Sequence, residues 1–263
     1  MTVESAPIDA PEKTARETGW LVYGVVPGDV EVVDEARGAG DPPAPVRVVQ
    51  HRDLGALVSE VRLDRPLGRP DDLRAYKELL DGTTLAAPVL PVRFGTVLTE
   101  PAAVAELLDA EHDAYLAELT DLTDRLQYVV RARYRERELL TDVLAGNAEA
   151  ARLREQLADL PEEASRDLRI RLGEVIATEV EARRQADTGR LVAELSPVSV
   201  EVADREPTHE EDAAHVAFLV AADRTTDFEG VVERLAADWA DRATVRLLGP
   251  MAAYDFVGRI GRE

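Results

Sequence analysis

The sequence has no cysteine and no long apolar run, and each absence excludes a class of protein. Without cysteine there is no disulfide, no thiolate metal site and no cysteine nucleophile, and this composition fits a reducing cytoplasm. No segment approaches the roughly 18 uninterrupted apolar residues that a membrane-spanning helix needs. Residues 1–20 also lack the basic segment and apolar run of a secretion signal. We therefore expect a cytoplasmic protein that does not bind a membrane.

Positive charge is scarce as well. The chain carries 52 Asp and Glu against 31 Lys and Arg, its formal net charge is −21, and Lys13 and Lys77 are its only lysines. Such a charge repels nucleic-acid phosphates and anionic lipid headgroups, so we expect no nucleic-acid partner. A chain of 263 residues that is 45% hydrophobic can bury a substantial core. Its length favours two domains.

Residues 18–124 are predicted to form a smaller N-terminal α+β domain, after a disordered tail at 1–17 that is small, polar and proline-bearing. The predicted elements are a strand at 20–26, a hairpin at 46–61, a helix at 70–80, a strand within 87–98 and one long helix starting after Thr99. Thr99 is predicted to cap the long helix, with Pro101 in its first turn. Its apolar face is Val104, Leu107, Leu108, Tyr115, Leu119 and Leu122.

Residues 125–263 are predicted to form a ferredoxin-like domain, in which β-α-β-β-α-β elements make an antiparallel sheet with helices on one face. Alternation over residues 126–135 predicts a half-exposed first strand. A helical insertion is predicted at 136–160, broken at Gly146-Asn147. The later elements are a helix from Pro161 to about Leu195, strands at 198–202 and 215–221, another helix and a strand at 243–250. The second of these helices is predicted from a Thr226–Glu229 capping box and from an apolar stripe of Phe228, Val231, Val232, Leu235 and Trp239.

The residues favour no catalytic chemistry. Phosphate-binding loops, dinucleotide-binding glycines, zinc-protease histidine pairs and nucleophile-elbow serines are all missing. His209 lies in an acidic loop, but carboxylates near a loop histidine are expected in so acidic a chain. Glu111 and His112 interrupt the apolar stripe of the long helix, where a buried pair could act as acid or base; a stripe edge that reaches solvent has the same spacing. We predict no enzyme activity, no metal and no cofactor.

Two features are candidates for protein interaction. Arg131, Arg133 and Arg135 recur on one face of a predicted strand and form a basic ladder, although acidic neighbours across the sheet could neutralise them. The second feature is the segment "APVLPVRFGTVLTEP" at 87–101, whose prolines lack backbone donors and fit an edge strand. Within it, Arg93 offers a planar five-donor group and Gly95 permits a bulge or a close backbone approach. A structural corner between sheet and helix would have the same pattern.

The chain resembles the gas vesicle protein F/L family from about Trp20 to Val257. The resemblance rests on "VLPVRFGTVL" at 89–98, preceded by "WLVYGVV" and "DLGALVSEV", and on the closing "RLLGPMAAYDFVG" at 246–258. The P-x-R-F-G-T core and the final G-P…Y-x-F-V are its specific parts. Two departures concern the helix "RAYKELL", which lacks a histidine common in the family, and "MAA", which replaces an aromatic-proline run.

The resemblance implies a non-enzymatic role in gas vesicles, the gas-filled protein shells that give cells buoyancy. Family members are minor vesicle components or assembly factors that contact the very hydrophobic shell subunit and other accessory proteins. Candidate contact residues are Arg93, Phe94, Gly95, Arg131, Arg133, Arg135, Tyr254 and Phe256. The alternatives are a small-ligand-binding regulatory module of ferredoxin-like type and an enzyme that uses Glu111 and His112. A neighbouring gene for a very short, apolar, β-rich protein would favour the vesicle role.

Overall fold

The computed structural model describes residues 18–158, 160–161 and 165–258, so the predicted disordered tail at 1–17 lies outside the described residues. The chain divides into two compact units. Unit 1 contains the chain up to Leu80 together with Pro91–Leu116, and unit 2 contains Asp81–Leu90 together with the chain from Ala117 onward. The predicted domain boundary at residues 124–125 stays a prediction.

The sheet of unit 1 is antiparallel wherever its register is defined, with strand order β2-β3-β1-β4 and with β5 also paired to β1. Its strands are β1 (Thr18–Pro27), β2 (Arg47–His51), β3 (Leu54–Arg62), β4 (Leu90–Pro91) and β5 (Val97–Leu98). The predicted hairpin is confirmed, because β2 and β3 pair up to His51 opposite Leu54. The predicted strand within 87–98 is instead two short strands separated by a turn at Phe94 and Gly95.

The long helix expected after Thr99 is wrong in two respects. The structure has α2 (Pro101–Ala110) and α3 (His112–Asp121), and Glu111 between them leaves helical geometry at φ −125° and ψ 26°. Glu100, not Thr99, occupies the N-cap, and it makes no side-chain cap hydrogen bond. The break falls where polar residues interrupt the apolar stripe, and the His112 side chain there is only 12% exposed. The other helix of this half of the chain is α1 (Pro70–Thr84).

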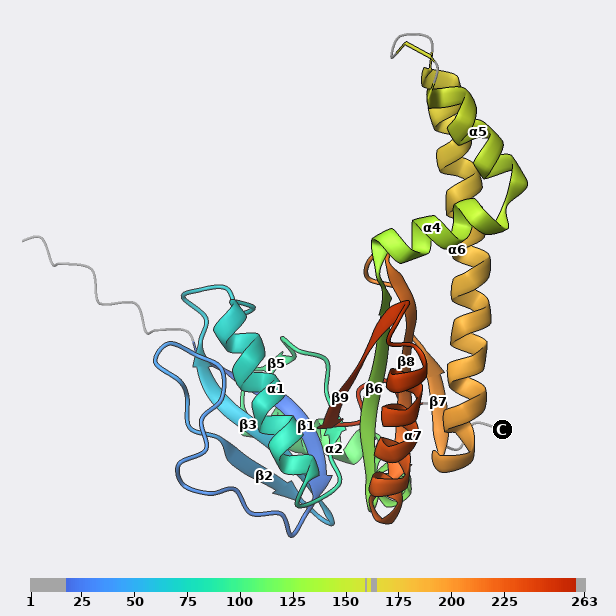
Figure 1. Ribbon diagram of the computed structural model, residues 1–263. Coiled ribbons are helices and arrows are strands. Elements are labelled where there is room, and N and C mark those ends of the chain that lie inside the picture. Colours follow the sequence, from blue (N-terminus) through green and yellow to red (C-terminus); the bar gives the residue numbers. More distant parts are fainter. Residues whose placement is uncertain (1–17, 159, 162–164, 259–263) are drawn as a thin grey trace, which may run out of the picture. The chain divides into compact units, whose positions relative to one another are not determined.

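The sheet of unit 2 is antiparallel with strand order β7-β8-β6-β9. Its strands are β6 (Arg125–Tyr134), β7 (Glu201–Asp204), β8 (Asp212–Ala221) and β9 (Ala243–Met251). Helices α6 (Arg166–Leu195) and α7 (Thr225–Asp238) cover one face, as Figure 1 shows. Their side chains meet alternate residues of β6 and β8 in the core, with Trp239 and Phe228 fully buried. The chain therefore has the predicted mixed α+β class.

Three local predictions for unit 2 need correction. The strand expected at 198–202 starts at Glu201, because Ser196–Val198 form a 3₁₀ turn that contains Pro197. The Thr226 capping box is absent, since Arg224 is the N-cap of α7 and no side chain caps it. The outer face of β6 is not half-exposed throughout, because Gln127 is completely buried and its amide binds the Asp255 carboxylate.

Helices α4 (Glu136–Gly146) and α5 (Ala148–Ala158) lie between β6 and α6, where a helical segment broken at Gly146-Asn147 was expected. Asn147 explains the break, since its side-chain oxygen accepts hydrogen bonds from the backbone N–H groups of Glu149 and Ala150 at 3.0 Å each and so caps α5. In Figure 1 these helices and the first half of α6 extend beyond the sheet. Within the described residues, no helix is apolar over enough of its length to cross a membrane.

Candidate interaction site

Arg93 lies in an open turn at the outer edge of the unit 1 sheet. The turn joins β4 to β5, both of which pair with β1. The Val92 N–H donates to the Tyr23 carbonyl at 2.9 Å, and the Val22 N–H donates to the Thr96 carbonyl at 2.9 Å. The segment between is tied to itself, because the Thr96 N–H and hydroxyl both contact the Arg93 carbonyl. The Arg93 side chain is exposed and, among the described residues, has no ion-pair or hydrogen-bond partner.

Phe94 and Gly95 have intramolecular reasons for their identity. The Phe94 ring packs edge-on against Tyr76 with ring centroids 5.3 Å apart. Tyr76 in turn donates its hydroxyl to the Val92 carbonyl, and burial raises the pKa of Tyr76 to about 12. Gly95 has φ +89°, a value that favours glycine, but nothing lies within 4 Å of where its Cβ would be. Gly95 therefore sets the turn geometry, and no close backbone approach occurs there within the chain.

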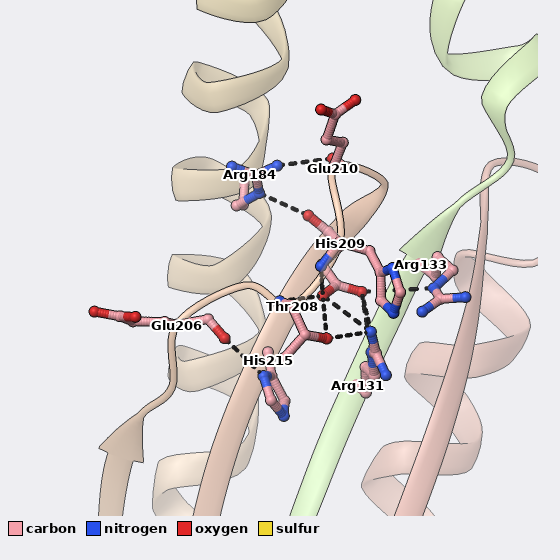
Figure 2. Close-up of polar contacts among 9 residues, drawn as sticks. Arg131, Arg133, Arg184, Glu206, Thr208, His209, Glu210 and His215 are labelled. Carbon is pink, nitrogen blue, oxygen red and sulfur yellow. Dashed lines mark hydrogen bonds and ion pairs between the residues drawn. The ribbon is translucent and has the colours of Figure 1, made fainter.

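Arg131 on β6 is neutralised by an acidic neighbour across the sheet, which was one of the two interpretations of the basic ladder. Its guanidinium contacts both carboxylate oxygens of Asp212, at 3.0 and 3.1 Å. Asp212 is completely buried, and it also accepts hydrogen bonds from the backbone N–H groups of Thr208 and His209 at 2.8 and 3.0 Å. Figure 2 shows these donors gathered around one carboxylate. The Arg131–Asp212 pair thus fastens the β7–β8 loop to β6.

The charge of Asp212 depends on these donors. Burial alone would raise the pKa of Asp212, but the hydrogen bonds from Arg131, Thr208 and His209 outweigh it. The pKa of Asp212 is therefore held well below its usual range. Loop formation and carboxylate ionisation consequently support each other.

Arg133 and Arg246 lie on the same face of the sheet, and neither is fully neutralised by a carboxylate in the part of the chain that the structure describes. Arg133 is 43% exposed and lies 3.6 Å from the Asp212 carboxylate, whose oxygens Arg131 already occupies. Arg246 on β9 lies directly opposite Arg131 in register, is exposed, and pairs with no carboxylate among the described residues. With Thr244 and Leu248 these arginines line a cavity of about 370 Å³. The basic face of unit 2, defined as Arg133 and Arg246, is an exception on a strongly acidic chain.

Arg135 does not extend this ladder. It has left β6 and occupies the N-cap position of α4, where its backbone carbonyl accepts from the Leu139 N–H at 2.9 Å. Sequence reasoning missed Arg246 because it lies 115 residues after Arg131 (246 − 131) and only strand pairing brings the two together.

The two aromatic residues of the closing motif have different environments. Phe256 is completely buried, so its side chain contributes to the core and is not on the surface. Tyr254 is half-buried and its hydroxyl lies 3.1 Å from an Asp81 carboxylate oxygen, which also accepts the Ala252 N–H at 3.0 Å. The closing motif is thus tied down by internal contacts of unit 2.

Glu111 and His112 do not form an acid–base pair. Glu111 is exposed at the junction of α2 and α3. The His112 ring nitrogens lie 3.1 Å from Asp113 and 4.0 Å from Asp53, and no hydrogen bond between His112 and Glu111 is present in the described part of the chain. His51 instead binds Asp109 at 3.0 Å, and this contact together with Arg52 lowers the pKa of Asp109.

The loop around His209 contains no assembled metal site. No group of three or more histidine, aspartate or glutamate side chains with metal-binding geometry occurs among the residues that the structure describes. His209 contributes its backbone N–H to Asp212 at 3.0 Å. We predict that protein purified without added metal contains less than stoichiometric metal by elemental analysis. A stoichiometric metal that is lost on His209→Ala would contradict this.

A second buried carboxylate, that of Asp72, was not predicted from the sequence. Asp72 is 2% exposed at the start of α1 and forms a two-pronged contact with Arg65, at 2.7 and 2.8 Å. The backbone N–H groups of Gly40, Gly68 and Arg69 also donate to it. The hydrogen bonds from Arg65 hold the pKa of Asp72 well below its usual range. An acidic residue in the first turn of a helix was the only signal in the sequence.

Comparison with known proteins gives a consistent result. A family model described as "Gas vesicle synthesis protein GvpL/GvpF" matches residues 19–258. Gas vesicle protein F of Streptomyces sp. (strain CB03234) is 33% identical over 247 residues, which cover 90% of this chain and 98% of that protein. Gas vesicle protein F of Dolichospermum flosaquae is 24% identical over 238 residues, covering 89% and 96%.

The fold is also shared with solved structures. The crystal structure of gas vesicle protein GvpF from Microcystis aeruginosa has a TM-score of 0.73 at 20% sequence identity, covering 90% of this chain and 98% of that one. The structure of GvpF from Anabaena sp. PCC7120 also has a TM-score of 0.73, at 21% identity, covering 91% and 98%. The resemblance found in the motifs is confirmed, and the chain belongs to the GvpL/GvpF family of gas vesicle synthesis proteins.

Proposed function

We propose that this chain is a cytoplasmic accessory protein of gas vesicles that binds the hydrophobic shell subunit and assists vesicle nucleation and assembly. Family membership and relatives named gas vesicle protein F support the vesicle role. A strongly charged partner would help keep an aggregation-prone, β-rich subunit dispersed.

The observation that carries the shell-binding proposal is the Arg93 turn. Two strands of only two residues each cover the outer edge of β1, and the turn between them presents an unpaired guanidinium. An edge of this kind can pair with an extended segment of a partner, while the charge disfavours association between copies of the chain. Arg93 is therefore placed to contact backbone carbonyls or a carboxylate of the bound subunit.

Unit 2 is proposed to be a ferredoxin-like domain. Its elements follow the order β6, α6, β7, β8, α7, β9, with the inserted helices α4 and α5 before α6. On the face opposite α6 and α7, the side chains of Arg133, Thr244, Arg246 and Leu248 are exposed and could contact a partner. The basic face of unit 2 lies there and is the second candidate contact for another accessory protein.

We predict that Arg93→Ala weakens capture of a co-expressed shell subunit several-fold while the unfolding midpoint stays within a few degrees. The side chain is exposed and unpaired, so removing it changes the free energy of unfolding by less than about 1 kcal/mol. The matched control is Arg47→Ala, which removes another exposed arginine without a described partner at the opposite edge of the same sheet. Quantitative co-purification and thermal unfolding measure the two effects.

If Arg93→Ala and Arg47→Ala reduce capture equally, a general charge effect explains the loss and the Arg93 contact is wrong. If Arg93→Ala leaves capture intact, the basic face of unit 2 becomes the contact to test, through Arg133→Ala with Arg246→Ala. Gly95→Val should reduce both capture and stability, because valine at φ +89° costs roughly 1–3 kcal/mol of backbone strain.

A further inference from the structure

The helical segment of unit 2 contains an apolar groove between α4 and α6. Its volume is about 480 Å³, and its position is beyond the end of the sheet, where Figure 1 shows α4 crossing α6. The apolar side chains that line it are Leu139, Leu140, Ile176, Ala177 and Val180. Leu139 is buried in the core of unit 2, and Ile176 and Val180 pack against that core with part of their surface exposed. Leu140 is also half-buried and Ala177 is exposed, so the groove floor is apolar and only partly covered.

Gly173 opens this groove. It lies within α6, one turn before Ala177, and nothing is found within 4 Å of the position its Cβ would take. Glycine inside a helix costs roughly 1 kcal/mol relative to alanine, and here no crowding within the chain requires it. A side chain at this position would occupy space in the groove. Gly173 therefore leaves open space in the groove, although no neighbouring atom within the chain requires a glycine there.

The rim of the groove is acidic. Glu136, Glu210 and Glu211 line it and form no ion pair among the described residues. The one lining cation is Arg184, which is already engaged: it pairs with Glu181 and donates to the backbone carbonyls of Asp212 and Glu210 at 2.7 and 2.8 Å. Figure 2 shows its contact with Glu210. The groove thus combines an apolar floor with uncompensated negative charge.

We propose that this groove binds an amphipathic helical segment of another protein, with an apolar face toward α6 and lysine or arginine beside the rim glutamates. Helix-in-groove recognition uses an apolar floor for anchors spaced three and four residues apart, and opposite charge at the rim adds specificity. A second copy of this chain is a poor occupant, because two molecules of net charge −21 repel each other. The site is separate from the Arg93 turn and does not depend on the shell-binding proposal.

The test uses the full chain and a labelled helical peptide of leucine and lysine, about 16 residues or roughly 24 Å long. Fluorescence anisotropy measures its affinity for the wild type, Gly173→Leu and Gly189→Leu. Both glycines lie inside α6 with open space at Cβ, but Gly189 does not line this groove. Gly173→Leu should weaken binding about tenfold or more, whereas Gly189→Leu should stay within about twofold. Circular dichroism checks that both variants keep their helices.

The charge component is tested separately. Glu210→Gln combined with Glu211→Gln should weaken the leucine–lysine peptide about three- to tenfold and reduce the dependence of its affinity on salt. A leucine–glutamate peptide of the same pattern should not bind. Equal affinity of the leucine–lysine peptide for all variants would mean that net charge alone attracts it, and this result would overturn the proposal. The absence of binding to the wild type would also overturn it. None of these outcomes bears on capture of the shell subunit.

Discussion

Replacing Asp212 by asparagine is expected to lower the free energy of unfolding by about 3 kcal/mol at neutral pH, as measured by urea denaturation. The substitution removes a completely buried charge and leaves the Arg131 guanidinium without its partner. It also weakens the acceptor that holds the backbone N–H groups of Thr208 and His209. The β7–β8 loop should loosen first, because these contacts fasten it to β6.

The effect should depend on pH in one direction. The folded-state pKa of Asp212 is depressed below its ordinary value of 3.8, so below that value the unfolded chain binds more protons than the folded chain. The stability that Asp212 contributes is therefore complete above about pH 4 and is lost as the pH falls through the folded-state pKa. The difference between wild type and Asp212→Asn should shrink on acidification and should not change between pH 6 and pH 8.

The matched control is Asp204→Asn, which removes an exposed aspartate at the end of β7 and should change stability by less than about 0.5 kcal/mol. In a double-mutant cycle, Arg131→Met should cost less in the Asp212→Asn background than alone, by at least about 1 kcal/mol. Additive effects of the two substitutions would mean that the pair does not act as a unit.

Gly249→Ala should destabilise unit 2 by about 2–4 kcal/mol, measured by thermal and urea unfolding. Gly249 has φ +136°, and a Cβ there would lie 2.9 Å from the Gln127 carbonyl oxygen and 2.9 Å from the Tyr128 ring. Both obstacles belong to β6, where the register with β9 shifts between Gln127 and Val129. Relief would require β6 to move and would disturb the Gln127 side chain, which accepts the Asp255 N–H at 2.9 Å.

Gly82→Ala is the control for a general glycine effect. Gly82 lies in α1 with nothing within 4 Å of its Cβ position, so alanine should be neutral or stabilising by up to about 1 kcal/mol. A Gly249→Ala protein as stable as the wild type would show that the close approach to β6 is not what requires glycine in this motif.

Much of the fold could be predicted because it depends on local patterns. The strand at β1, the hairpin of β2 and β3, and the buried stripe of α7 all follow from periodicity and turn residues within short windows. The break between α4 and α5 was predictable for the same reason, since Asn147 caps a helix with its own side chain. The helix break at Glu111 was not predicted, because the apolar stripe of Leu107, Leu108 and Tyr115 continues across it at helical spacing.

The sequence by itself determined the α+β class and, through two motifs, the family, together with the order of the elements outside residues 87–121. The prolines at 88 and 91 also predicted that Arg93 and Gly95 lie at a sheet edge, as they do. Only the tertiary structure decided which arginines remain available. Arg131 finds its buried carboxylate 81 residues away, Arg246 comes to lie beside it on the neighbouring strand, and Phe256 is buried. Periodicity and turn propensity act between near neighbours, whereas burial and ion pairing depend on which strands become adjacent in the folded sheet.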